Sequence, residues 1–286
     1  MQDRYVGDVG DFGKYGLLRA LCGADEHGAA LRLGVHWHRV DGGRPSSRGD
    51  GSHTQYLDRP SRQERLLREC DRDLLARLRQ LVRGARTIDA VETSGALPAG
   101  TLYFGRAPDF ARAPRAERAS HRRRWRDAGL RALEGLDIVF HDPDNGLEVP
   151  SSRPLTRSGA KHAYYEDLRA YWQRGQSLVV YHHVGRTWRG QQATAEEQVA
   201  HRVTELRREL PGAEPLALRF RRRSARVYFV VSAPAHDGRL RARASAFLSS
   251  AWGRGHPPHF EGMGVAVPAP GVTGGSAGPG SAGARR

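Results

Sequence analysis

The residue types best suited to chemistry lie in one short turn, Asp142-Pro143-Asp144-Asn145. The apolar run at 138–140 that precedes it is typical of a buried strand, and the turn residues are typical of that strand's carboxyl end. Ligands of open α/β sheets bind at this edge. An Asx turn alone would not need the three carboxylates of Asp142, Asp144 and Glu148 within seven residues. The sequence therefore predicts a catalytic role for Asp142, Pro143, Asp144 and Asn145.

A second segment, GDVGDFGKYG at 7–16, combines two aspartates with Lys14, one of only two lysines in the chain. The other lysine, Lys161, lies in GAKHAYYEDL, and the remaining 44 basic residues are arginine. A compact ammonium suits a position that a planar guanidinium does not fit. Either the lysines mark functional positions, or their placement is chance.

Hydrophobic periodicity and turn residues predict the elements that must position these segments. Asp11 is expected to cap the first helix, and Thr194 with Glu197 forms a predicted capping box. A long loop is expected at 41–58. The expected helices are 12–21, 62–82, 116–133, 164–174, 194–209 and 240–247, and the expected strands are 31–40, 87–91, 101–104, 136–141, 177–182, 216–220 and 227–231.

Alternating strands and helices predict an α/β protein with a mostly parallel, Rossmann-like sheet. The last two expected strands form a C-terminal β-hairpin that would add one antiparallel edge strand. We expect a single domain over residues 1–252. The Gly-, Pro- and Ala-rich segment 253–286 is predicted to be a disordered tail.

Composition narrows the classes of protein. A formal net charge of +15 favours a nucleic-acid partner. The arginine clusters at 122–126 and 219–223 are either a phosphate-binding patch or an ordinary solvated surface. No apolar stretch approaches the roughly 20 residues that span a bilayer, so we expect a soluble, cytoplasmic protein without a membrane partner. Cys22 and Cys70 lack CxxC spacing, which argues against a disulfide framework or a thiolate zinc site.

Three segments carry a resemblance to known proteins: YVGDVGDFGKYGLLR, LDIVFHDPDNGLE and QSLVVYHHVGR. They are similar to segments of an uncharacterised bacterial protein group, over roughly residues 4–232. More distantly, GDVGDFGKYGLL resembles the G-N-x-A-D-x-x-K-H motif of large-subunit ribosomal RNA adenine-N6 methyltransferases. Those enzymes are class I S-adenosylmethionine-dependent methyltransferases, whose sheet also closes on a terminal hairpin and whose fourth strand ends in D-P-P-Y.

The resemblance implies a methyltransferase that uses S-adenosylmethionine and acts on an amino group in nucleic acid. Asp142 would accept a hydrogen bond from the amine, Pro143 would present a carbonyl, and Asn145, which replaces the tyrosine, would orient the base. VHWHRVDGG replaces the glycine-rich turn after the first strand. The implied cofactor-binding residues are Gly10, Asp11, Lys14, Asp41 and Glu92, and the implied substrate-binding residues are His141, Tyr164, Tyr165, His182, His183, Arg122 and Arg123.

Two other functions remain open from the sequence. In a Mg²⁺-dependent nuclease or phosphodiesterase, His182 or His183 would act as base or ligand, and the metal ligands would be Asp8, Asp11, Asp142, Asp144 and Glu148. A non-catalytic adaptor would hold nucleic acid through the arginine clusters and stack bases on Trp125, Trp172 or Trp188.

Overall fold

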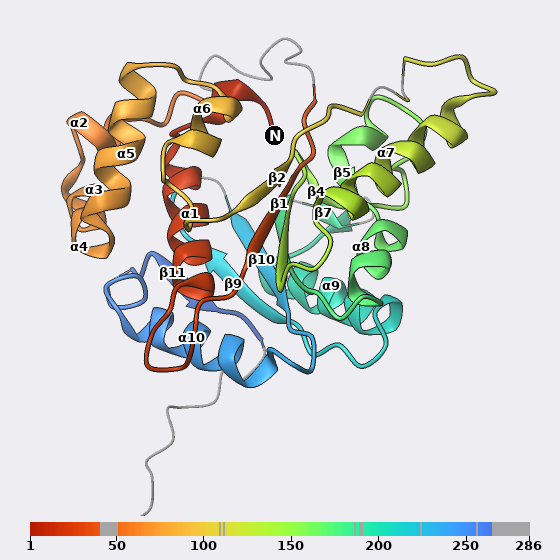
Figure 1. The fold of residues 1–286 in the computed structure, drawn as a ribbon. Helices are drawn as coiled ribbons and strands as arrows, with labels where there is room; N and C mark the ends of the chain where they lie inside the picture. The colour runs from red at the N-terminus through yellow and green to blue at the C-terminus, as the bar shows by residue number, and fades with distance from the viewer. Residues whose placement is uncertain are drawn as a thin grey trace, which may run out of the picture.

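One seven-stranded sheet forms the centre of the protein in a computed structural model (Figure 1). The structure describes residues 1–40, 51–108, 110, 112–185, 187–188, 191–223, 225–255 and 257–264. The strand order is β2-β1-β3-β6-β10-β9-β11. The strands are β1 (Leu33–Trp37), β2 (Leu102–Phe104), β3 (Ile138–Asp142), β6 (Ser177–His183), β9 (Leu216–Phe220), β10 (Arg226–Val231) and β11 (Phe260–Gly262).

The first four of these strands are parallel, so the predicted α/β class with a mostly parallel sheet is confirmed. The antiparallel part differs from the prediction. Strand β10 pairs with β6 on one side and β9 on the other, so it lies inside the sheet. The edge strand is β11, which pairs with β9. The sheet thus continues past residue 252, and the predicted disordered tail is wrong for 260–262.

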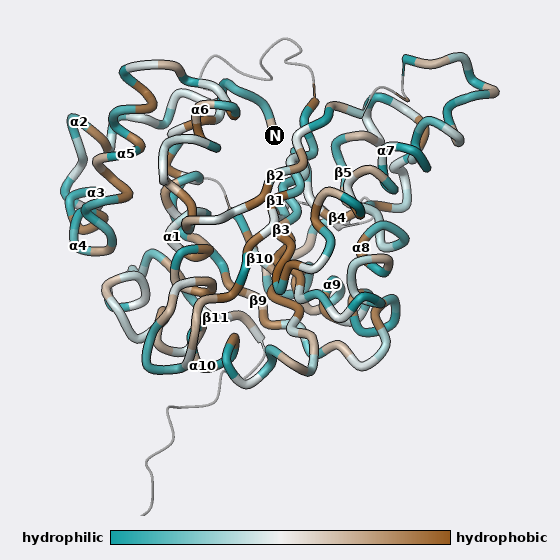
Figure 2. The backbone as a smooth tube through the Cα atoms, viewed as in Figure 1, coloured by the Kyte–Doolittle hydropathy of each residue, from teal (hydrophilic) through white to brown (hydrophobic). Residues whose placement is uncertain are grey.

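Helices cover both faces of the sheet (Figure 1). On one face lie α1 (Val9–Cys22), α5 (Arg72–Arg83) and α10 (Asp237–Ser249). On the other lie α7 (Arg118–Ala132), α8 (Tyr165–Trp172) and α9 (Ala195–Glu209). Each layer buries its own apolar cluster against the sheet. The middle strands are buried throughout their length, as a parallel sheet covered on both faces requires, and they are largely hydrophobic in Figure 2.

Shorter elements join these layers. Residues 55–70 form three single-turn helices, and two-residue ladders extend the loops that follow β3 and β6. No helix in the described part of the chain has the length and apolar character needed to cross a membrane. The short elements are α2 (Gln55–Asp58), α3 (Arg62–Arg65), α4 (Leu67–Cys70), α6 (Ile88–Thr93), β4 (Gly146–Leu147), β5 (His162–Ala163), β7 (Thr187–Trp188), β8 (Gln191–Gln192) and the 3₁₀ helices Asp3–Tyr5 and Gly159–Lys161.

Capping explains where the predicted elements were right and wrong. Thr194 and Glu197 form the predicted capping box of α9. The predicted strand at 87–91 is wrong: Thr87 accepts a hydrogen bond from the Ala90 amide and begins helix α6. Strand β3 is therefore third along the chain among the sheet strands. The cap of α1 is Asp8 and not Asp11, and the predicted 62–82 helix is interrupted where Asp71 caps α5.

Glycines let α1 lie close to the C-terminal half of the chain. A Cβ atom at Gly13 would lie 2.8 Å from the Phe220 ring, and one at Gly16 would lie 2.3 Å from the Trp252 ring. Such distances are shorter than van der Waals contact, so only glycine fits. The spacing of these glycines therefore places one face of α1 directly against β9 and residue 252.

Candidate functional site

Two clusters of buried polar side chains meet at the carboxyl end of β3. Adjacent residues of a strand point to opposite faces. Asp142 faces α1, where it contacts Lys14, and His141 faces the α7–α8 layer, where its ring lies 5.0 Å from that of Tyr171. Both clusters are at the sheet edge where the sequence predicted chemistry.

We call the first the lysine–aspartate cluster; it consists of Asp11, Lys14, Asp142, Asp144 and Lys161. The Lys14 ammonium lies 2.9 Å from Asp11 and 2.8 Å from Asp142, and all three side chains are buried. Burial alone would lower the pKa of Lys14, but these two carboxylates together raise it, so the side chain stays charged. Residues 7–16 and the 142–145 turn therefore share one ion network.

Lys161 completes this cluster from the other side of the turn. Its ammonium lies 3.1 Å from Asp144, which also accepts a hydrogen bond from Gln2 at 2.9 Å. The Asn145 amide donates to the Lys161 carbonyl at 2.9 Å. Both lysines of the chain thus bind acidic residues of the same turn.

The second cluster, which we call the histidine cluster, consists of His36, His38 and His141. His36 and His141 are register partners on β1 and β3, and His38 follows β1 by one residue. The three side chains are 0–1% exposed, and one nitrogen of each lies within 4.8 Å of the others. A Cβ atom at Gly129 of α7 would lie 3.0 Å from the His36 ring, so this glycine lets the helix cover the cluster.

Burial keeps these histidines neutral. Desolvation lowers the pKa of His141 to about 3 and also lowers the pKa values of His36 and His38 well below the ordinary range. Aromatic rings surround them. The ring centroids of Phe104 and Trp125 each lie 4.9 Å from that of His36, and the Tyr171 centroid lies 6.1 Å from it. The cluster is therefore a set of uncharged imidazoles in an apolar enclosure.

The remaining predicted cofactor residues have structural partners. A Cβ atom at Gly10 would lie 2.6 Å from the Arg226 guanidinium, which pairs with Asp8 at 3.2 Å. Glu92 lies on α6 and not on a strand, but it reaches the end of β1, where it accepts a hydrogen bond from Trp37 at 3.0 Å. Asp41, with Gly42 and Gly43, lies outside the described residues.

Several predicted substrate-binding residues lie inside the α7–α8 layer. Arg122 is buried, pairs with Asp167 at 2.5 Å and lies over the Tyr164 ring at 4.9 Å. The Tyr165 hydroxyl donates to Glu205 at 2.8 Å. Arg123, which was also predicted to bind substrate, is exposed on α7. The predicted cluster at 122–126 is thus divided between a buried ion pair and a solvent-facing side.

Residues around the turn are held by β6 and α8. His182 accepts a hydrogen bond from the Leu147 amide at 3.1 Å, and His183 is exposed. Glu148 accepts from the Tyr165 amide at the start of α8 at 2.9 Å, and burial raises the pKa of its carboxyl. Within the turn, Pro143 is buried and Asn145 is exposed.

The five carboxylates proposed to bind Mg²⁺ do not form one site. Asp8 pairs with Arg226, Asp11 and Asp142 pair with Lys14, Asp144 pairs with Lys161, and Glu148 caps α8. Among the described residues, the one group with metal-binding geometry is the histidine cluster. The acidic residues are therefore arranged around internal cations.

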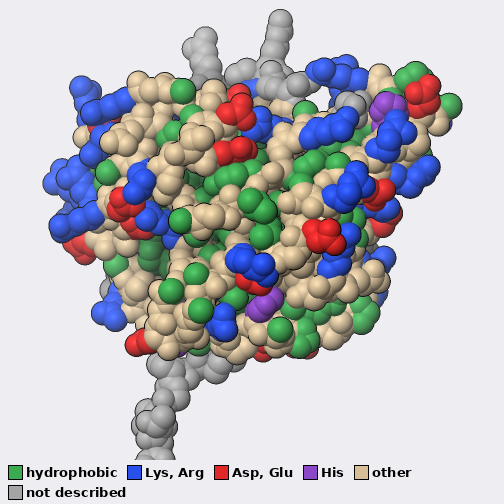
Figure 3. All heavy atoms as spheres, in the orientation of Figure 1, with side chains coloured by type: hydrophobic (Ala, Val, Ile, Leu, Met, Phe, Trp, Pro, Cys, Tyr) green, Lys and Arg blue, Asp and Glu red, His purple; other side chains and the backbone are tan. Residues whose placement is uncertain are grey.

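Lysine and arginine side chains in Figure 3 gather over α7 on one side and over α2–α5 on the other. Arg123 and Arg124 are exposed on α7. The predicted cluster at 219–223 is largely neutralised, because Arg219 and Arg221 pair with Glu261 and Arg223 pairs with Glu64. The solvent-facing side of α7 is thus the better candidate for phosphate contacts.

Of the adaptor's stacking candidates, Trp125 is buried against Phe110 and the histidines. Trp172 packs at the margin of the same core, and the side chain of Trp188 lies outside the described residues. Stacking on Trp125 would require α7 to move.

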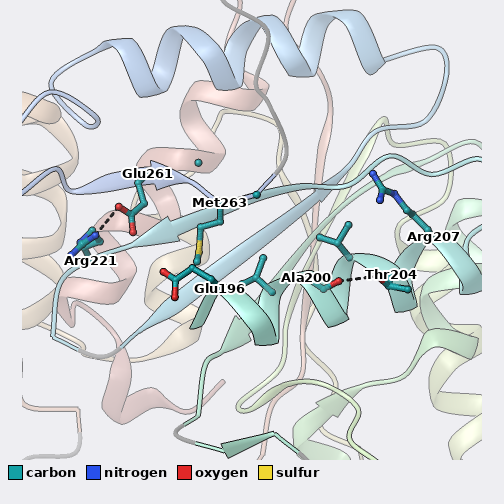
Figure 4. Close-up of a pocket in the computed structure, with 11 residues that line it drawn as sticks. Glu196, Ala200, Thr204, Arg207, Arg221, Glu261 and Met263 are labelled. Atoms are coloured by element: carbon teal, nitrogen blue, oxygen red, sulfur yellow. Dashed lines mark hydrogen bonds and ion pairs between the residues drawn. The ribbon is translucent and has the colours of Figure 1, made fainter. Parts of the chain in front are cut away.

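A separate pocket of about 620 Å³ lies between α9 and the segment 261–264 (Figure 4). Val199, Val203 and Met263 contribute its apolar lining, and charged residues such as Glu196 and Arg221 also line it. No member of either cluster lines this pocket. It is therefore distinct from the predicted site.

His36 and His38 were not among the residues predicted from the sequence. A signal was present, because a His-x-His pair on a strand places both side chains on one face. This pair forms a cluster only together with His141, which is 103 residues from His38 in the sequence. The pairing of β1 with β3 brings the three histidines together. The chain matches no protein-family model, no curated protein and no solved structure.

Proposed function

We propose that this protein is an S-adenosylmethionine-dependent methyltransferase that acts on an amino group, with nucleic acid as the preferred substrate. The observation that carries the proposal is the Lys14–Asp142 ion pair at 2.8 Å. It joins the 7–16 segment to the 142–145 turn at the carboxyl edge of the parallel strands, where α/β proteins bind ligands. These are the two segments on which the methyltransferase resemblance rests.

The reaction needs positioning more than acid–base strength. The amine nitrogen attacks the methyl carbon of the sulfonium, the new C–N bond forms as the C–S bond breaks to release S-adenosylhomocysteine, and the proton on the nitrogen passes to water. Asn145, the exposed member of the turn, is suited to accept a hydrogen bond from the amine. Asp142 faces Lys14, so we assign it a positioning role: it fixes the turn that presents Asn145 and the Pro143 carbonyl.

Glu92 is the proposed contact to the cofactor ribose. It lies on α6 beside Trp37, the last residue of β1, and Arg39 lies 3.3 Å from its carboxylate. An acidic group near the end of the first strand can accept hydrogen bonds from ribose hydroxyls. This assignment keeps the predicted residue and changes the element that carries it.

Nucleic acid is preferred as substrate because of charge. The net charge is +15, and the exposed Arg123 and Arg124 of α7 are available on the side of the sheet that His141 faces. Arginine on a solvent-facing helix is suited to phosphate. A Mg²⁺-dependent nuclease is less well supported, because its candidate carboxylates are already engaged by Lys14, Lys161 and Arg226.

Calorimetry with S-adenosylmethionine, and separately with S-adenosylhomocysteine, tests the proposal on the full chain with and without Mg²⁺. We expect binding that does not depend on Mg²⁺. A ligand at 100 times its Kd should stabilise the protein by about 2.7 kcal/mol in thermal unfolding. Absence of binding by both compounds would overturn the proposal, and Mg²⁺-dependent strand cleavage would favour the nuclease.

Asp142→Asn tests the turn, with Asp137→Asn as the matched control. Asp137 lies just before the same strand and pairs with Arg32 on the surface. Asp142→Asn should lower the rate of methyl transfer at least about 100-fold, since a small misplacement of the reacting groups has that effect. Asp137→Asn should leave the rate unchanged. Equal activity of both variants would remove Asp142 from the proposed site.

A further inference from the structure

The histidine cluster presents nitrogen atoms that lack partners. Tyr171 Oη lies 3.2 Å from Nδ1 of His36, and Nε2 of His38 lies 3.4 Å from Nδ1 of His141. The three other ring nitrogens are buried and have no hydrogen-bond partner among the described residues: His36 Nε2, His38 Nδ1 and His141 Nε2. A buried polar atom without a partner is unfavourable, so the unpartnered Nε2 of His36 within this group of three imidazoles points to a missing ligand.

The geometry suits a metal ion better than a further hydrogen bond. A separation of 3.4 Å is long for a hydrogen bond. Two nitrogens bound tetrahedrally to one zinc ion, each at about 2.0–2.1 Å, lie roughly 3.4 Å apart. The contact between His38 Nε2 and His141 Nδ1 therefore already has the spacing of two ligands of one ion, and His36 Nε2, which has no hydrogen-bond partner among the described residues, would be the third ligand atom.

The surroundings also match a metal site. A metal-binding histidine commonly donates its second N–H to an oxygen, which fixes the ring, and Tyr171 offers that oxygen to His36. The pKa of each histidine is lowered by burial, so each ring keeps a lone pair at neutral pH. On the other face, the carboxylates that Mg²⁺ would prefer are bound to lysines.

We propose that His36, His38 and His141 bind one divalent transition-metal ion, with Zn²⁺ the best match to three imidazole ligands. Three protein ligands leave one coordination position for a water molecule or another non-protein group. The ion would tie the end of β1 to the end of β3. Because His141 is bonded to Asp142, it would also fix the start of the turn that carries Asp142–Asn145.

Metal content and affinity test this directly on the full chain. The protein is treated with a chelator, equilibrated with Zn²⁺, desalted and analysed by mass spectrometry for bound zinc, with calorimetry for the Kd. We expect one zinc per chain and a higher Tm, because an ion that binds only the folded state stabilises it. Folded protein that retains less than about a tenth of an equivalent after loading at 100 µM Zn²⁺ would overturn the proposal.

Single variants locate the site. His36→Gln, His38→Gln and His141→Gln should each weaken zinc binding at least about 100-fold, which exceeds the usual effect of losing an outer partner. His183→Gln is the matched control, because His183 is exposed at the end of the neighbouring strand β6, and it should keep the wild-type affinity. Unchanged affinity in all three cluster variants would place the ion elsewhere and overturn the assignment.

A spectroscopic measurement on the unmodified sequence covers the case in which a variant does not fold. Co²⁺ loaded into the chelator-treated protein should show the intense visible absorption of a low-coordinate nitrogen site. A spectrum like that of hydrated Co²⁺ would contradict the proposal. Binding of S-adenosylmethionine, measured on metal-free protein, is a separate result, so either proposal can fail without the other.

Discussion

The histidine cluster and the Lys14 side of the lysine–aspartate cluster are both buried at the end of β3, but they differ in how their polar groups are satisfied. Lys14 and the Asp142 carboxylate face each other at 2.8 Å, so opposite charges compensate one another. In the histidine cluster, no charge is present and three ring nitrogens lack partners within the described structure. The charges of the ion network are paired within the protein, whereas the histidine cluster leaves ring nitrogens available for a ligand.

This difference suggests that the lysine–aspartate cluster fixes the position of the turn, whereas the histidine cluster is suited to bind a ligand. A buried ion pair contributes little net stability but is strongly destabilising to break, so it fixes geometry. Buried nitrogens without partners are retained at a cost, which is expected at functional sites. His141 and Asp142 are adjacent in sequence and take part in these opposite arrangements, because strand alternation sends them to different faces.

Replacing Lys14 should have the largest effect. Lys14→Met removes the cation that pairs with the buried Asp11 and Asp142 carboxylates, which should lower the free energy of unfolding by about 3–5 kcal/mol at pH 7. The loss should be smaller at pH 5, because an unpaired buried carboxylate has a raised pKa and protonates there. Urea unfolding at both pH values measures this.

Lys14→Met combined with Asp142→Asn is the control for that prediction. Removing one of the two uncompensated charges should recover part of the lost stability. A double variant no more stable than Lys14→Met would show that the ion network is not what holds helix α1 against the turn.

Acid titration distinguishes the histidine cluster. In metal-free protein, burial lowers the pKa of His141 to about 3, whereas the unfolded chain takes up its proton near pH 6.5. The unfolded state therefore binds more protons below pH 6.5, and stability falls as the pH falls. Each such histidine should contribute about 1.4 kcal/mol per pH unit between roughly pH 6 and 4.

Denaturant unfolding of metal-free protein at pH 4.5, 5.5 and 6.5 measures that slope. His141→Gln should reduce the slope of unfolding free energy against pH by the contribution of one titrating group. Bound Zn²⁺ should make the slope steeper, because protons compete with the ion for the histidine nitrogens. An unchanged slope in His141→Gln would mean that this ring is not buried and neutral.

The smallest effect is expected at Lys161, whose side chain is 38% exposed in its ion pair with Asp144. Lys161→Met should lower the free energy of unfolding by no more than about 1 kcal/mol, because solvent screens such pairs. Both variants are measured in the same urea titration. If Lys161→Met lost as much unfolding free energy as Lys14→Met, the Lys161–Asp144 pair would not be the more exposed and weaker part of this cluster.

Part of the site could be predicted from local pattern. The apolar run of β3 followed by a proline-containing acidic turn identified the 142–145 corner, and the rarity of lysine singled out Lys14 and Lys161. Glu92 was predicted at the end of a strand, but it lies on helix α6 and contacts Trp37 at the end of β1. Thr87 reads as the start of a strand by alternation, yet its hydroxyl caps a helix, and packing decides between the two.

The sequence alone determined the elements whose signals are local: the buried strand at 138–142, the capping box before α9 and the two strands at 216–231. Tertiary structure decided which of these meet. Lys14 reaches Asp142 across 128 residues, and His36 becomes a neighbour of His141 through the register of β1 with β3. The physical reason is that spacing along the chain fixes the face of a side chain, but only the packing of distant elements fixes what lies opposite that face.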